Sequence, residues 1–145
     1  MEYLAHIADD GREQTVGEHL RSAAEYASRA LAPAGLCEAG YLCALLHDCG
    51  KYTELFDRYI HSNGEMRRGS VNHTFSGVRL IMERCHNEPP ASTRDIFGEL
   101  LAYAVGAHHG EFDIADEDGK NGFFHRMKKE DIGYEEAVSN LYRAP

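Results

Sequence analysis

Residues 39–51 of this chain are predicted to form a buried helix that leads directly into a short polar turn. Leu42, Leu45 and Leu46 recur at helical spacing, and small side chains fill the positions between them. Gly50 closely follows the last apolar residue and indicates the end of the helix. A helix that is apolar on most of its faces belongs in the core, so the rest of the chain is expected to fold around it.

The polar turn carries side chains that can bind metal ions. His47 offers a neutral nitrogen, and Asp48 offers oxygens that can bridge two ions. Side chains at the end of a core helix are held rigidly, as a metal site requires. Lys51 carries a positive charge that could meet a phosphate. Taken alone, this turn also fits an ordinary solvated helix end, so the other histidines must decide.

The composition is that of one soluble globular domain. The chain has 145 residues, of which 43% are hydrophobic and 27% are charged. Its longest apolar runs are far too short to span a membrane. Residues 1–14 are acidic and lack the apolar core of an export signal, so we expect a cytoplasmic protein.

The cysteines do not form a metal or disulfide framework. None of Cys37, Cys43, Cys49 and Cys85 forms a CxxC pair, and the first three lie in or beside the central helix. This spacing argues against a disulfide scaffold and against a structural zinc knuckle. Reduced, mostly buried thiols are expected.

The charge balance argues against tight, independent binding of DNA. The net charge is -9, from 24 acidic and 15 basic residues. Basic residues form only short groups, at 67–68 and 126–129, whereas an autonomous nucleic-acid binder usually shows a basic face. A nuclease that receives its strand from a partner is still compatible with this charge.

Helical periodicity accounts for most of the chain. Thr15, followed three residues later by Glu18, predicts a capping box and a helix start. The predicted helices cover 17–32, the central stretch within 39–51, 53–61, 73–85, a segment from Ser92 or Thr93 to about 107, and two short segments within 123–143. Residues 62–71 and 111–122 are predicted loops. No alternating strand pattern is found, so the predicted fold is all-α.

Five of the nine histidines fall where predicted helices begin or end. They are His19, His47, His73, His108 and His109. Helix ends can meet at one face of a bundle, so these residues can converge. Together with Asp48 they have the chemistry of a two-metal site, which activates water and stabilises phosphoryl charge. The remaining histidines, His6, His61, His86 and His125, are expected to be surface or satisfied core residues.

The order of these motifs resembles the HD superfamily of metal-dependent phosphohydrolases. Four segments resemble, more narrowly, the HD nuclease domain of the CRISPR-associated helicase–nuclease of type I systems. They are YLAHIADDGREQTVGEHL, LLHDCGKYTELF, NHTFSG and AVGAHHGEF. The resemblance runs from Tyr3 to about Arg126, and the combination in this order is specific.

The resemblance implies a helical HD bundle with a metal site at converging helix ends. One ion would be held by His19, His47, Asp48 and a downstream aspartate, and the other by Asp48, His73, His108 and His109. Asp48 and Lys51 would be the catalytic residues: Asp48 would bridge the ions and Lys51 would help to hold the scissile phosphate.

The resemblance also implies cofactors and partners. An imidazole-rich site favours one or two divalent transition-metal ions, such as manganese, iron, cobalt, nickel or zinc, with magnesium less favoured. The implied activity is metal-dependent endonucleolytic cutting of single-stranded DNA. The implied partners are a helicase domain or subunit and the RNA-guided surveillance complex that recruits it, and no membrane is involved.

Two departures from the family pattern stand out. Asp113, Asp116, Asp118 and Asp131 are present, but none has the sequence context of the downstream aspartate. The GxxxxGK[ST] phosphate loop is absent, so the helicase would be another chain or a part that has been removed. We therefore expect residues 1–145 to be a single HD-type nuclease domain that is truncated at its C-terminal end.

Two other functions fit the same residues. The first is an HD-type phosphohydrolase that acts on a small nucleotide, which needs a closed pocket able to read a base and a sugar. The second is an inactive helical module that binds metal. The N-terminal block at residues 3–20 favours the nuclease.

Overall fold

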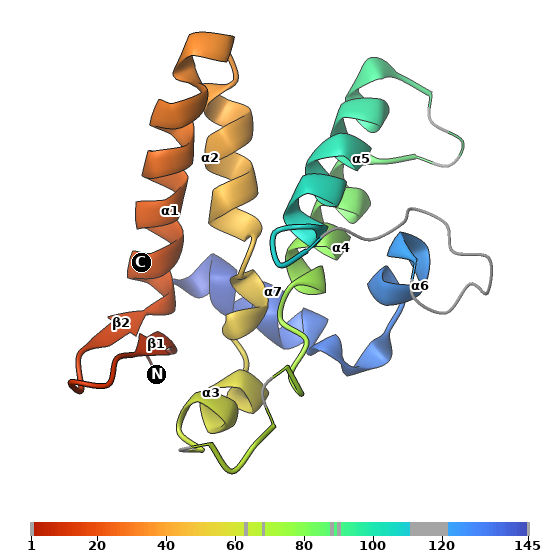
Figure 1. The fold of residues 1–145 in the computed structure, drawn as a ribbon. Helices are drawn as coiled ribbons and strands as arrows, with labels where there is room; N and C mark the ends of the chain where they lie inside the picture. The colour runs from red at the N-terminus through yellow and green to blue at the C-terminus, as the bar shows by residue number, and fades with distance from the viewer. Residues whose placement is uncertain are drawn as a thin grey trace.

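The structure is a computed structural model, and it describes residues 2–62, 64–67, 69–87, 89, 91–110 and 122–144. Its helices are α1 (Val16–Leu31), α2 (Cys37–Leu46), α3 (Glu54–Ile60), α4 (Phe75–Cys85), α5 (Thr93–Gly106), α6 (Phe123–Met127) and α7 (Tyr134–Arg143). Short 3-10 turns lie at Ala32–Ala34, Cys49–Lys51 and Glu130–Ile132. The predicted all-α, bundle-like architecture is confirmed, with one small addition at the N-terminus (Figure 1).

Helices α1 and α2 form an antiparallel hairpin (Figure 1). The capping box predicted at the start of α1 is present: the Thr15 hydroxyl accepts from the Glu18 amide at 3.2 Å, and the Glu18 carboxylate accepts from the Thr15 amide at 3.0 Å. These bonds satisfy amide groups that the first helical turn would otherwise leave unpaired. The cap therefore fixes the first turn of α1, which carries His19.

A second pair of helices, α4 and α5, packs beside the first, and α7 crosses the ends of both pairs (Figure 1). The main core lies between α2, α4, α5 and the C-terminal elements, and includes Val78, Val105 and Phe123. The amide of Asn140 on α7 donates to the carbonyl oxygen of Tyr52 at 3.0 Å. Helix α7 thus supports the turn that follows α2.

The expectation of no strands is wrong at the N-terminus. Strands β1 (Leu4–Ile7) and β2 (Glu13–Thr15) pair antiparallel and lead directly into α1. Gly11, with a φ of 82°, closes the turn between them. Strands of four and three residues are too short to show an alternating pattern in the sequence. Ala5 of β1 and Val16 of α1 belong to a second, smaller core.

Several smaller predictions can also be compared with the structure. All four cysteines are free, as expected, but only Cys49 is buried. Helix α4 begins at Phe75, so His73 lies in the segment before it and not in its first turn. No helix among the described residues has the length and apolarity to cross a membrane.

Candidate metal centre

Asp48 lies at the junction of α2 and the Cys49–Lys51 turn, where the apolar helix meets the polar sequence that follows it. Its carboxylate is buried, with 3% of the residue exposed. A carboxylate removed from water in this way needs compensating partners, because burying an unpaired charge is very costly. Histidines and one lysine from five parts of the fold provide these partners.

The Oδ2 atom of Asp48 faces two imidazoles. His19 Nε2 lies 3.1 Å from this oxygen and His47 Nε2 lies 3.3 Å from it. The two histidine nitrogens are 3.2 Å apart. His19 comes from the first turn of α1 and His47 ends α2. We call His19, His47 and Asp48 the Oδ2 group.

The Oδ1 atom of Asp48 faces three other imidazoles. The distances to Nε2 are 3.1 Å for His108, 3.4 Å for His73 and 4.0 Å for His109. His73 and His109 meet each other at 3.1 Å between their Nε2 atoms. His73 precedes α4, whereas His108 and His109 follow α5. We call Asp48, His73, His108 and His109 the Oδ1 group.

The spacing of the ligand atoms fits divalent cations. Within each group, the nitrogen and oxygen atoms that face inward all lie within 4.8 Å of one another. Ligand atoms that each sit about 2.1 Å from one ion lie at most about 4.2 Å apart. A small inward movement of the side chains would therefore let either group bind an ion. The structure therefore brings all six predicted ligands together into a cluster that could hold metal.

Three of the imidazoles are fixed in the tautomer that a metal site requires. A carbonyl oxygen only accepts hydrogen bonds, so the ring nitrogen that faces it must carry the proton. Such Nδ1 bonds run from His47 to Ala44 at 2.6 Å, from His108 to Val105 at 2.6 Å and from His73 to Val71 at 3.3 Å. In the neutral rings, Nε2 therefore carries no proton and can bind an ion beside Asp48. A ring that carries a proton on both nitrogens can instead donate from Nε2 to Asp48.

The electrostatics keep the carboxylate ionised. Burial alone would raise the pKa of Asp48. Hydrogen bonds from His108, His19 and His47, together with the charge of Lys51, instead hold this pKa far below its usual range. Asp48 is therefore available as an anionic bridge between the two groups.

The histidine pKa values differ between the groups. Burial lowers the pKa of His73 to about 4, and burial followed by the charge of His108 lowers the pKa of His109. For His47 the effect of burial is outweighed by its hydrogen bond and charge interaction with Asp48, so its pKa is raised. The neutral form, which binds metal, is thus favoured for His73 and His109 in the Oδ1 group.

Two glycines allow the backbone segments to approach closely enough to build the site. A Cβ atom at Gly50 would overlap the carbonyl oxygen of His73, and one at Gly77 would overlap that of Leu46. The sequence indicated only a helix stop at Gly50. Its structural role is to let the His73 segment lie against the turn that carries Asp48.

Lys51 is buried in the same cluster. Its ammonium nitrogen lies 2.9 Å from Asp48 Oδ2, and only 4% of the residue is exposed. In this geometry the lysine neutralises and orients the aspartate. The phosphate-binding role expected from the sequence stays a prediction.

His6 lies beside the centre, whereas it was expected to be a surface or satisfied core residue. Its Nε2 is 3.4 Å from Lys51 Nζ, and its ring meets that of His19 edge-on, with 4.8 Å between centroids. Burial and the nearby charge of Lys51 lower the pKa of His6. His6 lies on strand β1, which was not predicted. Its position could have been inferred only by recognising this four-residue strand in the sequence.

The remaining predicted residues lie elsewhere or cannot be compared. His61 pairs with Asp57 at 3.6 Å, and His86 pairs with Glu99 at 3.0 Å, as expected of histidines outside a metal site. His125 is exposed on α6. The candidate replacements for the downstream aspartate, Asp113, Asp116 and Asp118, lie outside the described residues, as does the side chain of Asp131.

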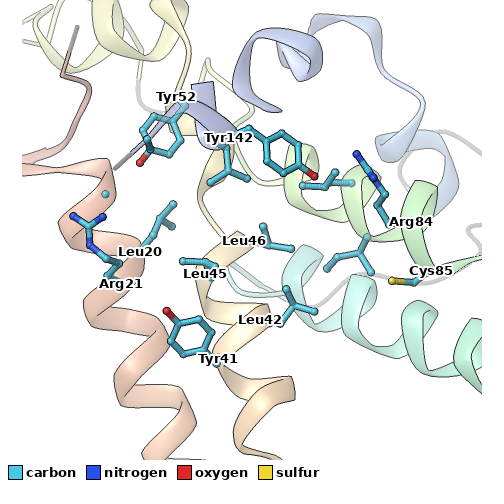
Figure 2. A pocket seen from close by; sticks show the side chains of 15 residues that line it. Leu20, Arg21, Tyr41, Leu42, Leu45, Leu46, Tyr52, Arg84, Cys85 and Tyr142 are labelled. Atoms are coloured by element: carbon cyan, nitrogen blue, oxygen red, sulfur yellow. The ribbon is translucent and has the colours of Figure 1, made fainter. Parts of the chain in front are cut away.

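A groove of about 480 Å³ lies between α1, α2, α4 and α7, apart from the histidines of the Oδ1 and Oδ2 groups (Figure 2). Leu42, Leu45 and Leu46 line it together with Tyr41 and Tyr142. None of the six predicted metal ligands takes part in its lining. This apolar groove is therefore distinct from the polar cluster around Asp48.

The comparisons with known proteins agree with this arrangement. A family model described as HD domain matches residues 16–142. The matched region includes Asp48 and all five histidines of the two groups, whereas β1 and His6 lie outside it. No curated protein matches the chain.

Proposed function

The chain belongs to the HD domain family, and from this premise we propose that it is a metal-dependent endonuclease that cuts single-stranded DNA. The coarser assignment, a metal-dependent phosphohydrolase, follows from the family and from the His/Asp cluster. The finer one rests on the sequence resemblance to the nuclease domain of type I CRISPR systems. On that reading, a helicase and an RNA-guided surveillance complex deliver the strand.

The observation that carries the proposal is the sharing of one buried carboxylate between two imidazole groups. Each oxygen of Asp48 faces its own set of Nε2 atoms. Bound divalent ions would supply Lewis acidity for the attack of water on a phosphoryl group. The chain's own contribution is to hold Asp48 ionised, to keep the imidazole lone pairs aimed inward, and to fix the spacing of the two groups.

The exposure of the site supports a polymeric substrate. The side chain of His109 is 60% exposed, whereas the other four histidines of the centre are only 18–19% exposed. Within the described part of the chain, the side of the centre on which His109 lies is therefore the most exposed to solvent. A strand that passes such an edge can reach the site without entering an enclosed pocket. The net charge of -9 is consistent with delivery of the strand by a partner.

The test compares substrates as well as variants. The purified chain is incubated with Mn²⁺ and either circular single-stranded DNA, the matching duplex, or a panel of nucleoside mono-, di- and triphosphates. Conversion of the circular strand to linear fragments, with the duplex intact, is the expected result. A His108→Ala, His109→Ala double variant should be inactive, and His61→Ala should match the wild type.

Other outcomes count against the proposal in different ways. Hydrolysis of a nucleotide with no cutting of the circular strand would replace the nuclease with a small-molecule phosphohydrolase. Cutting that survives the double substitution would show that the activity comes from a contaminant. Strong cutting of intact duplex in the absence of a helicase would contradict the preference for single strands.

A further inference from the structure

The geometry points to His6 as a positioning residue of the metal centre, delivered by the β1–β2 hairpin, that orients Lys51 and His19 around Asp48. This inference rests on the proposed metal-dependent function. It adds to the site a residue and an element that lie outside residues 16–142, the region that matches the family model.

The hairpin contains an irregularity at the position that faces the centre. Leu4 pairs with Thr15 and His6 pairs with Gln14, so two steps along β1 match one step along β2. The additional residue is Ala5, which is 2% exposed. An extra residue of this kind is a β-bulge, which bends a strand and redirects its side chains, and such bulges are frequent beside active sites. The bulge sets the direction of both Ala5 and His6.

The redirected strand supplies two of the three acceptors of a buried ammonium group. Lys51 Nζ lies 3.4 Å from the Ala5 carbonyl oxygen, 3.4 Å from His6 Nε2 and 2.9 Å from Asp48 Oδ2. An ammonium carries three N–H donors and no acceptor, so His6 Nε2 must accept. The three N–H donors of Lys51 thus meet three acceptors. Lys51 is only 4% exposed, and a buried cation needs such partners because burying an unpaired charge is costly.

His6 also touches the Oδ2 group directly. Its ring meets the ring of His19 at 74°, with centroids 4.8 Å apart. His19 in turn places its Nε2 3.1 Å from Asp48 Oδ2. A single side chain therefore contacts both the lysine and the histidine that converge on the same carboxylate oxygen. The Oδ1 group has no such contact with His6 among the described residues.

The expected consequence is selective. Loss of His6 leaves Lys51 with an unsatisfied donor and removes the ring against which His19 packs, so both can turn away from Asp48. Partners that orient a metal ligand from outside the coordination sphere typically contribute about 10–100-fold to metal affinity or activity. The Oδ2 group should therefore weaken by at least about tenfold, while the Oδ1 group keeps its affinity.

The test uses His6→Ala, His6→Gln and two matched controls. Glutamine places an amide oxygen near the position of Nε2, so it can still accept from Lys51. Glu13→Ala alters an exposed residue on the partner strand, and His61→Ala removes an exposed histidine outside the centre. Co²⁺ is titrated into each 145-residue protein, and the visible absorption of the bound ion is followed. In the same samples, kcat and KM are measured for a chromogenic phosphodiester.

Among the described residues the Oδ2 group offers three ligands and the Oδ1 group four, so the weaker Co²⁺ transition is assigned to the Oδ2 group. In His6→Ala we expect this weaker transition to shift at least about tenfold to higher concentration, with the tighter one unchanged. The kcat value should fall with KM changed less than about twofold, and His6→Gln should recover most of both losses. Glu13→Ala and His61→Ala should match the wild type.

The inference is overturned if His6→Ala keeps the wild-type Co²⁺ curve, or if both transitions weaken equally. It is also overturned if His6→Gln is as impaired as His6→Ala, because the accepting atom would then be irrelevant. Failure of the proposed function is separable, since a wild type that hydrolyses no phosphodiester still gives a Co²⁺ titration that decides the role of His6.

Discussion

At the scale of single residues, the centre depends on the negative charge of Asp48. Replacing it with asparagine keeps the size but removes the charge, and turns one acceptor into an N–H donor that faces histidines and Lys51. We predict that Asp48→Asn loses bound metal and at least about 100-fold of the phosphodiesterase activity, because both groups share this residue.

Metal analysis after gel filtration, together with a hydrolysis assay in Mn²⁺, measures both effects. His61→Ala is the control, since that histidine contacts only Asp57 among the interactions described above. Retention of the wild-type metal content by Asp48→Asn would show that the bridging role is misassigned.

The residues that could be predicted from the sequence are those tied to helix ends. His19 follows a capping box and His47 ends an apolar run, so both positions could be inferred from local pattern. The orientation of Lys51 could not, because it depends on a carbonyl and an imidazole from β1, more than 40 residues away in the chain. His6 was missed for the same reason.

At the scale of elements, the site depends on how closely α4 approaches the end of α2. A Cβ atom at Gly77 would overlap the carbonyl oxygen of Leu46 and lie 3.2 Å from Val105 Cγ1. We predict that Gly77→Ala lowers the free energy of unfolding by about 1–3 kcal/mol, the usual cost of overpacking a core. The displaced α4 should also weaken metal binding through His73.

Gly17→Ala is the matched control in another helix. Its Cβ atom would meet the tips of the Arg21 and Tyr52 side chains at 3.3 Å, and these can move, unlike a backbone carbonyl. Urea unfolding of both variants supplies the comparison. A Gly77→Ala protein as stable as the wild type would mean that the α2–α4 contact is looser than the structure shows.

A second element-scale prediction concerns the start of α5, whose far end leads into His108 and His109. Asp95 accepts from the amides of Ala91 and Ser92, each at 2.9 Å, and from the side-chain amide of Asn87 at 2.9 Å. Burial alone would raise the pKa of Asp95, but these hydrogen bonds hold it below its ordinary value. The carboxylate therefore stabilises the fold when it is ionised.

The pKa of Asp95 in the folded protein lies below that of an unfolded aspartate, which is about 3.9. The ionised carboxylate therefore stabilises the fold above about pH 3.9, and this stabilisation is lost as the pH falls through the folded-state pKa. Asp95→Asn lacks this contribution at every pH. We predict that its melting temperature is clearly below that of the wild type at pH 7, and that the gap narrows below about pH 4. A gap that is constant from pH 7 to pH 3 would exclude the charge as its cause.

Element types were more predictable than element edges. The capping box at Thr15 and the apolar spacing in α2 identified these two helices correctly, since local chemistry decides both. The expectation that α2 is buried is wrong: only Gly40 and Leu46 are buried in it, and Leu42 is exposed on the wall of the groove. The boundary of α4 was placed two residues early, because His73 is held by the packing of Gly50 and not by helical hydrogen bonds. The β1–β2 pair escaped notice because its pairing is stabilised by the smaller core it covers.

Across the centre as a whole, the two groups around Asp48 differ in their number of ligands. Among the described residues, the Oδ1 group offers four ligands, whereas the Oδ2 group offers three. A missing anionic ligand removes both a bond and a charge that would offset the cation. We predict one tight divalent site near His73, His108 and His109, and a second site near His19 that is at least about tenfold weaker.

Calorimetric titration with Mn²⁺ and with Co²⁺ measures both affinities. His109→Ala should weaken the tight site, and His19→Ala should abolish the weak one and leave the tight one in place. A further variant replaces every Asp and Glu within residues 111–118 by Asn and Gln. It tests whether a carboxylate of that segment is the additional ligand of the Oδ2 group. If it is, the weak site alone should lose affinity in this variant. The opposite result would be two sites of equal affinity, both unchanged in this variant. It would show that the ligands have been divided wrongly between the ions, because the three ligands of the Oδ2 group would then bind an ion as tightly as the four of the Oδ1 group.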